Sequence, residues 1–219
     1  MTHPHRLHAT AAALSLGAAR GRLTRNAEAE AAQIAAEALE APSVLRSTVY
    51  GGRHASGGHS DPTATAYLVA DRPFRVNQWQ ALADDITAHL ANLAQHLPAA
   101  GRDPLDRIRA AIPAMRPEIA HATTTALVHL DEIARRKLRT GPDRSPLRGV
   151  ACPHCGERQL MVQTAGPIDA WTVVCATGRL CAGTGCGCGM PGAVEGVAHI
   201  WWRADVIGAV AGAAPTHTE

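Results

Sequence analysis

All six cysteines of this 219-residue chain lie in one stretch, residues 151–189, which runs ACPHCGERQLMVQTAGPIDAWTVVCATGRLCAGTGCGCG. A C-x2-C pair opens the stretch, and the other four thiols follow at Cys175, Cys181, Cys186 and Cys188. Six thiols this close in sequence are explained by a bound metal, by disulfides or by redox chemistry. We expect the choice among these three to decide the fold of the C-terminal third.

The spacing of the first pair favours a metal. Zinc takes four ligands at the corners of a tetrahedron, and a C-x2-C turn supplies two of them from one loop. Pro153 stiffens that turn, and Gly156 lets the chain leave it with a positive φ. We therefore expect Cys152 and Cys155 to bind one ion together.

Two short β-like runs separate this pair from the third thiol. They are residues 159–164 and 171–175, and the Gly-Pro sequence at 166–167 marks a turn between them. The pattern predicts a β-hairpin, because strand-forming runs on either side of a turn pair with each other. Such a hairpin would return Cys175 to the first two thiols.

A C-P-x-C-G knuckle, a hairpin and a third cysteine at the end of the returning strand resemble a zinc ribbon. The resemblance implies one structural zinc whose four ligands close its coordination sphere. It ends at Cys175, because the usual second C-x2-C pair is missing from the chain. The ligands that we expect are Cys152, Cys155, Cys175 and Cys181, with Cys186 and Cys188 as alternates for the fourth.

Other interpretations of the thiols stay open. Cys-Pro-His-Cys also resembles the active site of the periplasmic disulfide oxidases, although Gly156 and a strand-like run follow here instead of a helix. An iron–sulfur cluster also needs four thiolates, and the loose spacing after Cys175 is compatible with one. Disulfides would require an oxidising compartment.

The N-terminal segment and the hydropathy bear on that compartment. Residues 9–19 are apolar and follow Arg6, as in a signal peptide, but they are rich in alanine rather than leucine. The longest C-terminal apolar run, residues 206–214, is too short for a membrane span. We expect a cytoplasmic protein with reduced thiols and no membrane partner.

Ahead of the cysteines, apolar spacing predicts helices. One begins at Asn26 and ends near Glu40, a second covers residues 76–97, and a long one covers residues 117–139. A shorter helix follows Asp103. The inward positions expected on the second helix are Trp79, Leu82, Ile86, Leu90, Leu93 and Leu97. Those expected on the long helix are Ile119, Thr123, Leu127, Leu130 and Ile133 or Ala134.

These patterns predict a mainly α chain, with an N-terminal helical bundle and a small C-terminal zinc-ribbon-like β module. Short turns between amphipathic helices imply antiparallel packing. His3, His5 and His8 are expected to be solvated rather than to chelate a metal. The boundaries that we expect are a flexible tail 1–25, the bundle 26–140, a basic linker 141–150, the module 151–205 and a C-terminal tail 206–219.

Residues 51–60 are rich in glycine and histidine. A linker is favoured over a phosphate-binding loop, because the spacing fits neither the P-loop nor the dinucleotide fingerprint. The overlapping string SGGHSDPTA, residues 56–64, is similar to one that precedes a helix in small phage and prophage proteins, among them presumed late-gene transcription regulators. Abundant alanine and a strong preference for arginine over lysine are also typical of a GC-rich genome, such as that of an actinobacterium or its phages.

Positive charge is concentrated just before the cysteines. Residues 101–150 carry ten Lys and Arg against six acids, whereas residues 151–219 carry three Arg against five acids. Cations at a helix C-terminus are favourable in any protein, but a phosphate-contacting arm is an equal alternative. The candidate phosphate contacts are Arg135, Arg136, Lys137, Arg139, Arg144 and Arg148.

The leading hypothesis is a non-enzymatic nucleic-acid-binding protein with one structural zinc, acting on DNA as a phage or prophage transcription regulator. A protein-interaction module that contacts the transcription machinery is the alternative. A thiol redox enzyme ranks third, because the sequence has no paired carboxylates, nucleophile elbow or Glu-bearing zinc motif.

Overall fold

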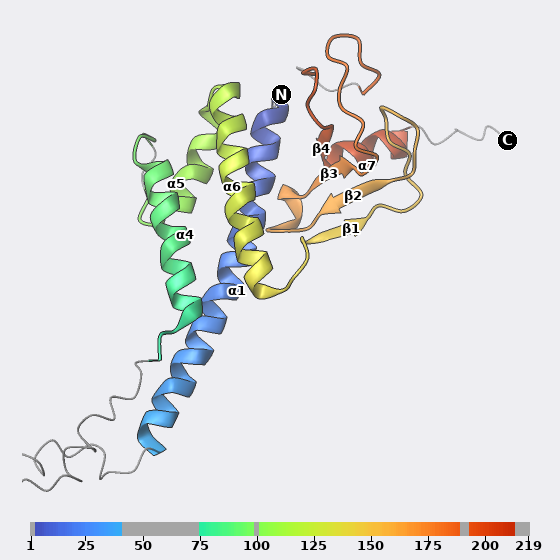
Figure 1. Ribbon diagram of the computed structural model, residues 1–219. Coiled ribbons are helices and arrows are strands. Elements are labelled where there is room, and N and C mark those ends of the chain that lie inside the picture. Colours follow the sequence, from blue (N-terminus) through green and yellow to red (C-terminus); the bar gives the residue numbers. More distant parts are fainter. Residues whose placement is uncertain (1–2, 41–74, 99–100, 189–192, 213–219) are drawn as a thin grey trace, which may run out of the picture. The chain divides into compact units, whose positions relative to one another are not determined.

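The computed structural model describes residues 3–40, 75–98, 101–188 and 193–212. The chain forms two units, residues 1–22 with 84–219 and residues 23–83. The helices in the described ranges are α1 (Pro4–Glu40), α4 (Gln78–Ala94), α5 (Pro104–Ala111), η2 (Ile112–Ala114), α6 (Pro117–Leu138), η3 (Ile168–Ala170) and α7 (Arg203–Gly212). The strands are β1 (Arg144–Pro146), β2 (Leu160–Gln163), β3 (Thr172–Cys175) and β4 (Ile200–Trp202), as labelled in Figure 1.

The first part of α1 lies at the centre of the larger unit, between α6 and the sheet (Figure 1). Ser15 Oγ donates a hydrogen bond to Asp131 Oδ2 of α6 at 2.8 Å. Leu7 and Ala11 pack against Ile200 of β4. The helix is rich in alanine, whose small side chain lets neighbours approach on more than one side. This segment therefore connects the helices to the cysteine-rich module.

The predicted flexible tail at residues 1–25 is wrong, because these residues belong to α1 from Pro4 onward. Ala9, Ala13, Leu16 and Ala19 are completely buried there. Alanine has the highest helix propensity. A helix buried on several sides has no single apolar stripe, so periodicity does not reveal it.

The other helices of the larger unit follow the sequence pattern closely. Asp103 caps α5, and its side chain accepts hydrogen bonds from the amides of Leu105 and Asp106. The predicted inward positions of α6 are confirmed for Thr123, Leu127, Leu130 and Ala134, which are all buried. Ile119 is the exception, with 41% of its surface exposed.

A four-stranded antiparallel sheet, in the order β1-β2-β3-β4, forms the base of the C-terminal part. The predicted hairpin is confirmed, since Leu160 of β2 pairs with Cys175 at the end of β3. β4 pairs with β3 on the other side, with Val173 opposite Trp201. Leu160 and Val173 are buried in a core that all six cysteines either join or contact. The six thiols are therefore part of the core that covers this small sheet or pack against it.

Two expected boundaries are corrected in this part of the chain, one by a strand and one by a helix. The predicted linker 141–150 contains β1, whose Arg144 pairs with Gln163 of β2. The predicted C-terminal tail begins inside α7, where Val206 is buried. Three residues are enough for a strand when a neighbour is already in place, but they are too few to give a periodic signal.

The smaller unit contains the rest of α1 and the start of α4. Asn77 caps α4, because its Oδ1 accepts hydrogen bonds from the amides of Trp79 and Gln80. Its Nδ2 donates to the carbonyl of Ala27 in α1 at 2.7 Å. The loop 51–60 and the string 56–64 lie outside the described residues.

No helix in the described ranges is both long enough and apolar enough to cross a membrane.

Candidate metal centres

The first group of thiols is built by a turn and a hairpin. Cys152 accepts a hydrogen bond at its carbonyl from the amide of Gly156 at 2.9 Å, and its own amide donates to the carbonyl of Glu157 at 2.8 Å. Gly156 has φ 73°, as predicted for the residue that leaves the turn. The β2–β3 hairpin then places Cys175 beside this turn.

The thiols of Cys152, Cys155 and Cys175, which we call the knuckle group, lie within 4.8 Å of one another. The sulfurs of Cys155 and Cys175 are 3.8 Å apart. Cys152 is buried, whereas the other two are partly exposed. The three thiols that the sequence predicts as metal ligands are thus brought together, and the group opens toward the surface on one side.

The three thiols of the knuckle group have different local environments. Burial raises the pKa of Cys152 to about 11. A backbone hydrogen bond at Glu157 lowers the pKa of Cys155 and favours its thiolate. The hydroxyl of Thr177 lies 3.0 Å from Cys175 Sγ and can donate to it. Burial favours the neutral thiol of Cys152. A bound metal cation would reverse this preference, because thiolates bind metals and thiols do not.

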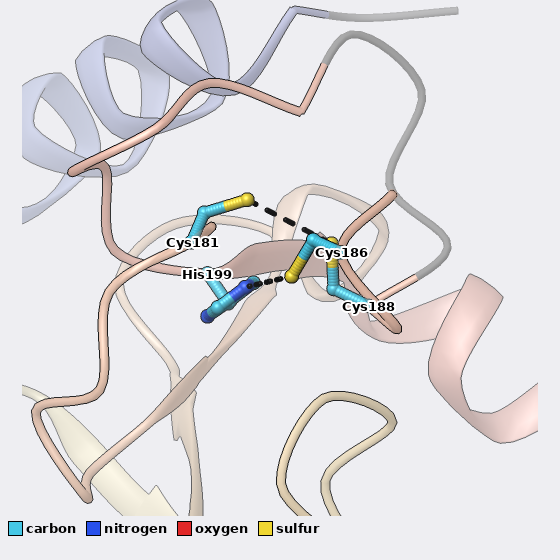
Figure 2. A group of neighbouring side chains, drawn as sticks. All are labelled: Cys181, Cys186, Cys188 and His199. Carbon is cyan, nitrogen blue, oxygen red and sulfur yellow. Dashed lines mark hydrogen bonds between the residues drawn. The ribbon is translucent and has the colours of Figure 1, made fainter. Parts of the chain in front are cut away.

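The second group comes from the loop after β3 and from the residue before β4. Figure 2 shows its four side chains converging: Cys181, Cys186, Cys188 and His199. We call them the loop group, and their ligand atoms also lie within 4.8 Å of one another. An isolated β-bridge pairs Leu180 of the loop with Ala198, two residues before β4. This pairing places Cys181 beside the start of β4, where His199 is located.

His199 has the orientation of a metal ligand. Its side chain is 1% exposed, and its Nε2 lies 3.5 Å from Cys186 Sγ. Its Nδ1 lies 3.3 Å from the carbonyl of Arg179, which accepts a hydrogen bond when Nδ1 carries the proton. Metal-binding histidines use this arrangement, because a hydrogen bond to one nitrogen fixes the tautomer and leaves the other free for the metal.

Backbone groups of the loop donate hydrogen bonds to thiols of the same site. The amide of Gly183 donates to Cys181 Sγ at 3.4 Å. A backbone hydrogen bond at Ala182, followed by the side-chain hydrogen bond of His199, lowers the pKa of Cys186 to about 5. Cys186 is therefore prepared to provide anionic sulfur near neutral pH.

His154 connects the two groups, although it belongs to the knuckle by sequence. Its Nδ1 lies 3.1 Å from Cys186 Sγ of the loop group. Its ring stacks on that of His199 with the centroids 4.0 Å apart. Its neighbours Cys152 and Cys155 contribute to the other group. The two groups thus lie side by side in one small core.

The expected fourth ligand of the knuckle, Cys181, is placed in the loop group instead. The chain turns at Gly178, where φ is 72°, and then pairs with the residues before β4. That turn carries Cys181 away from Cys175 and toward His199. The alternates Cys186 and Cys188 also lie in the loop group. A single four-thiolate site is therefore replaced by two adjacent groups.

His199 is the ligand that sequence reasoning did not assign. It lies eleven residues after Cys188 and outside any recognised spacing. Its position directly before the strand Ile200–Trp202 was the available signal, since a strand end can present a ligand as Cys175 does.

The terminal histidines behave differently. His3, His5 and His8 fall outside both metal-capable groups found in the described residues, and His8 Nε2 lies 2.9 Å from the carbonyl of Ala198.

The expected basic arm is only partly available to a partner. Arg135 is buried, and its guanidinium contacts Asp131 at 2.8 Å and Asp143 at 3.0 Å. Burial alone would lower the pKa of Arg135, but the two carboxylates outweigh it and raise the pKa. Arg135 is thus an internal ion-pair residue and not a phosphate contact. The exposed members of the set are Arg136, Lys137, Arg139, Arg144 and Arg148.

The chain has no match among protein-family models, curated proteins or solved structures, so the chemistry of the donor atoms has to indicate what the two groups do.

Proposed function

We propose that the chain is a zinc-containing, non-enzymatic protein whose C-terminal module is folded by the metal and which binds nucleic acid. The observation that carries the metal part is the loop group, in which three cysteines and His199 converge within 4.8 Å. Three thiolates and one imidazole form a donor set that zinc occupies in structural sites. Sulfur and nitrogen donors also argue against magnesium and calcium, which prefer oxygen.

The loop group supports a structural role for this zinc. Cys181, Cys188 and His199 are 5%, 3% and 1% exposed. Four protein ligands leave no position for a substrate on a tetrahedral ion. The ion would instead join the glycine-rich loop to His199, directly before β4. Zinc-ribbon identity is the narrower form of this proposal, and the knuckle and hairpin support it.

Five exposed cations support the nucleic-acid part. They extend from the end of α6 through β1 to the start of the knuckle, and they are Arg136, Lys137, Arg139, Arg144 and Arg148. Each phosphate that such a side chain neutralises releases counterions, so binding of this kind weakens as salt rises. DNA as the partner and transcription regulation as the role stay predictions.

The test begins with the metal. The purified full-length chain should contain zinc by elemental mass spectrometry, and chelation should abolish the near-ultraviolet circular dichroism of the module's tryptophans, Trp171, Trp201 and Trp202. Because α6 and the described part of α1 contain no metal-group residue, much of the helical signal should survive. A protein that stays free of metal and keeps that tryptophan signal would contradict the proposal.

Nucleic-acid binding is tested by titration with duplex DNA at two salt concentrations. Replacing Arg136, Lys137 and Arg139 with Gln should weaken binding and lower the salt slope by about 0.9 for each phosphate that is no longer neutralised. Replacing Arg102, Arg109 and Arg116 with Gln is the matched control, because these three exposed arginines lie outside the basic segment. Equal losses of affinity in both variants would indicate a general charge effect and no defined phosphate-contacting surface.

A protein partner is the second candidate. Two large apolar side chains of the module are well exposed, Ile168 at 62% and Leu180 at 54%. Their exposure favours a contact with another protein, since large exposed apolar groups are common at interfaces. Failure of the chain to bind DNA at either salt concentration would support this function over the first.

A further inference from the structure

The knuckle group is not complete as a zinc site. Its three thiols lie within 4.8 Å of one another, and among the described residues no fourth cysteine, histidine or carboxylate joins them. His154 is the nearest imidazole in sequence, but its Nδ1 lies 3.1 Å from Cys186 of the other group. Three thiolates leave one corner of a zinc tetrahedron for a ligand from elsewhere.

The surface beside the knuckle group has room for such a ligand. A Cβ added at Gly156 or at Gly178 would have no heavy atom within 4 Å. In the loop group, a Cβ added at Gly183 would meet Glu195 Cβ at 3.2 Å, but one added at Gly185 or Gly187 would also have no heavy atom within 4 Å. Cys155 and Cys175 are also partly exposed. The knuckle group therefore combines three thiols, two of them partly exposed, with no fourth donor among the described residues.

A hydrogen-bond donor is located at the same place. Thr177 Oγ1 lies 3.0 Å from Cys175 Sγ and 4.0 Å from Cys155 Sγ. A hydroxyl in this position stabilises negative charge on sulfur, as hydrogen bonds to metal-bound thiolates generally do. It precedes Gly178, so it lies at the edge of the open surface.

We propose that the knuckle group holds a second zinc ion whose fourth position is exchangeable and accepts a thiolate from outside the group. The inference rests on the metal binding proposed above and adds a second, open site to it. Sulfur is the expected donor, because coordination by four cysteine thiolates is well established for zinc. In the exchange a water leaves the zinc, a Zn–S bond forms, and the thiol proton goes to solvent. No electrons are transferred.

The experiment replaces zinc with Co²⁺ in the full-length chain and records its visible and near-ultraviolet spectrum. Two Co²⁺ ions should bind per chain. Adding 2-mercaptoethanol should increase the sulfur-to-cobalt charge-transfer absorption and saturate at one thiol per chain, with both ions retained after gel filtration.

Matched variants locate the response. Cys175→Ser should abolish the change on adding thiol and leave one cobalt in the loop group, whereas Cys188→Ser should alter the loop-group spectrum and keep the thiol response. Two bound ions in the wild type with no thiol response would overturn the inference, because the fourth position would then be filled by the chain itself. One bound ion would also overturn it while the structural zinc proposal stands, and no bound ion would overturn both.

Discussion

The knuckle group and the loop group both bring metal-binding side chains together, but they do so on different kinds of backbone. The knuckle has a regular backbone, made of a tight turn and a paired hairpin, but it collects only three donors among the described residues. The loop group lies on an irregular, glycine-rich segment, yet it collects four and buries His199 at 1% exposure. Regular secondary structure is therefore a poor guide to which metal site is complete.

The difference also separates what each ion would do. In the loop group the ion would hold a segment with little apolar surface of its own, so folding and metal binding should be strongly coupled there. The knuckle has a hairpin whose Leu160, Val162 and Val173 are already buried. Its ion should therefore contribute less to folding and be more accessible to ligands.

The largest expected effect is loss of the loop-group ligand His199. His199→Ala should remove one of two ions and lower the Tm by about 20–40 °C, because zinc binding in structural sites is worth on the order of 10 kcal/mol and each kcal/mol corresponds to about 2–4 °C in a chain of this size. Differential scanning calorimetry with metal analysis checks both values. His154→Ala is the control, since that ring stacks on His199 but is not needed to complete the site. Equal metal loss in the two variants would contradict the assignment of His199, and not His154, as the fourth ligand of the loop group.

Chelation should separate the two groups kinetically. With a chromogenic chelator in excess, the knuckle ion should leave first, and the loop-group ion should leave roughly tenfold more slowly or slower still, since its ligand set is complete and three of the four ligands are buried. Absorbance of the chelator–zinc complex follows the release. Cys155→Ser should remove the fast phase alone. A single phase in the unmodified protein would mean that the groups behave as one centre.

Immediately after chelation, while the module still has its folded geometry, pH should distinguish the thiols. The pKa of Cys186 is lowered to about 5 and that of Cys152 is raised to about 11, from an ordinary value of 9.0. The lowered pKa of Cys186 stabilises the fold above pH 9, and this contribution declines as pH falls toward 5. The raised pKa of Cys152 has the opposite sign, so its contribution is present below pH 9 and is lost as pH rises toward 11. Alkylation by iodoacetamide at about pH 7, mapped by mass spectrometry, should modify Cys186 much faster than Cys152, because the thiolate is the nucleophile.

The smallest effect is expected from Thr177→Val, which removes the hydroxyl next to Cys175 and keeps the shape. The knuckle ion should bind about tenfold more weakly, the lower end of what outer-shell hydrogen bonds contribute, and the loop-group ion should be unaffected. Competition titration with a zinc indicator measures both affinities. Thr164→Val is a control at the far end of β2, and a similar loss of affinity there would point to general destabilisation.

The fold was predictable wherever a pattern is local. The hairpin follows from two short runs around a Gly-Pro turn, and α6 follows from apolar positions such as Leu127 and Leu130. The start of α1 was not predictable in this way, because alanine on several faces gives no periodic signal. β1 was missed because three residues need a neighbouring strand before they have any preference.

The candidate sites divide along the same line. Cys152, Cys155 and Cys175 were predictable, since a turn and one hairpin bring them together. His199 completes the loop group only because Leu180 pairs with Ala198, a contact that no spacing rule contains. Arg135 was assigned to a surface by charge alone. Asp131 lies four residues earlier on the same helix, a spacing that indicates an ion pair, whereas Asp143 is brought to Arg135 by the chain that follows α6.

The central position of α1 has a consequence for biosynthesis. His8 contacts Ala198, a residue 190 positions later in the chain. At about 5–20 residues per second, a ribosome would need about 10 to 40 s to deliver that partner after the first helix has emerged. The cysteines are also translated late, so metal capture and the docking of the N-terminal helix fall in the same final interval. If zinc is scarce at that moment, the apolar surface of this alanine-rich helix stays exposed. Exposed apolar surface of this kind is bound by chaperones or leads to aggregation.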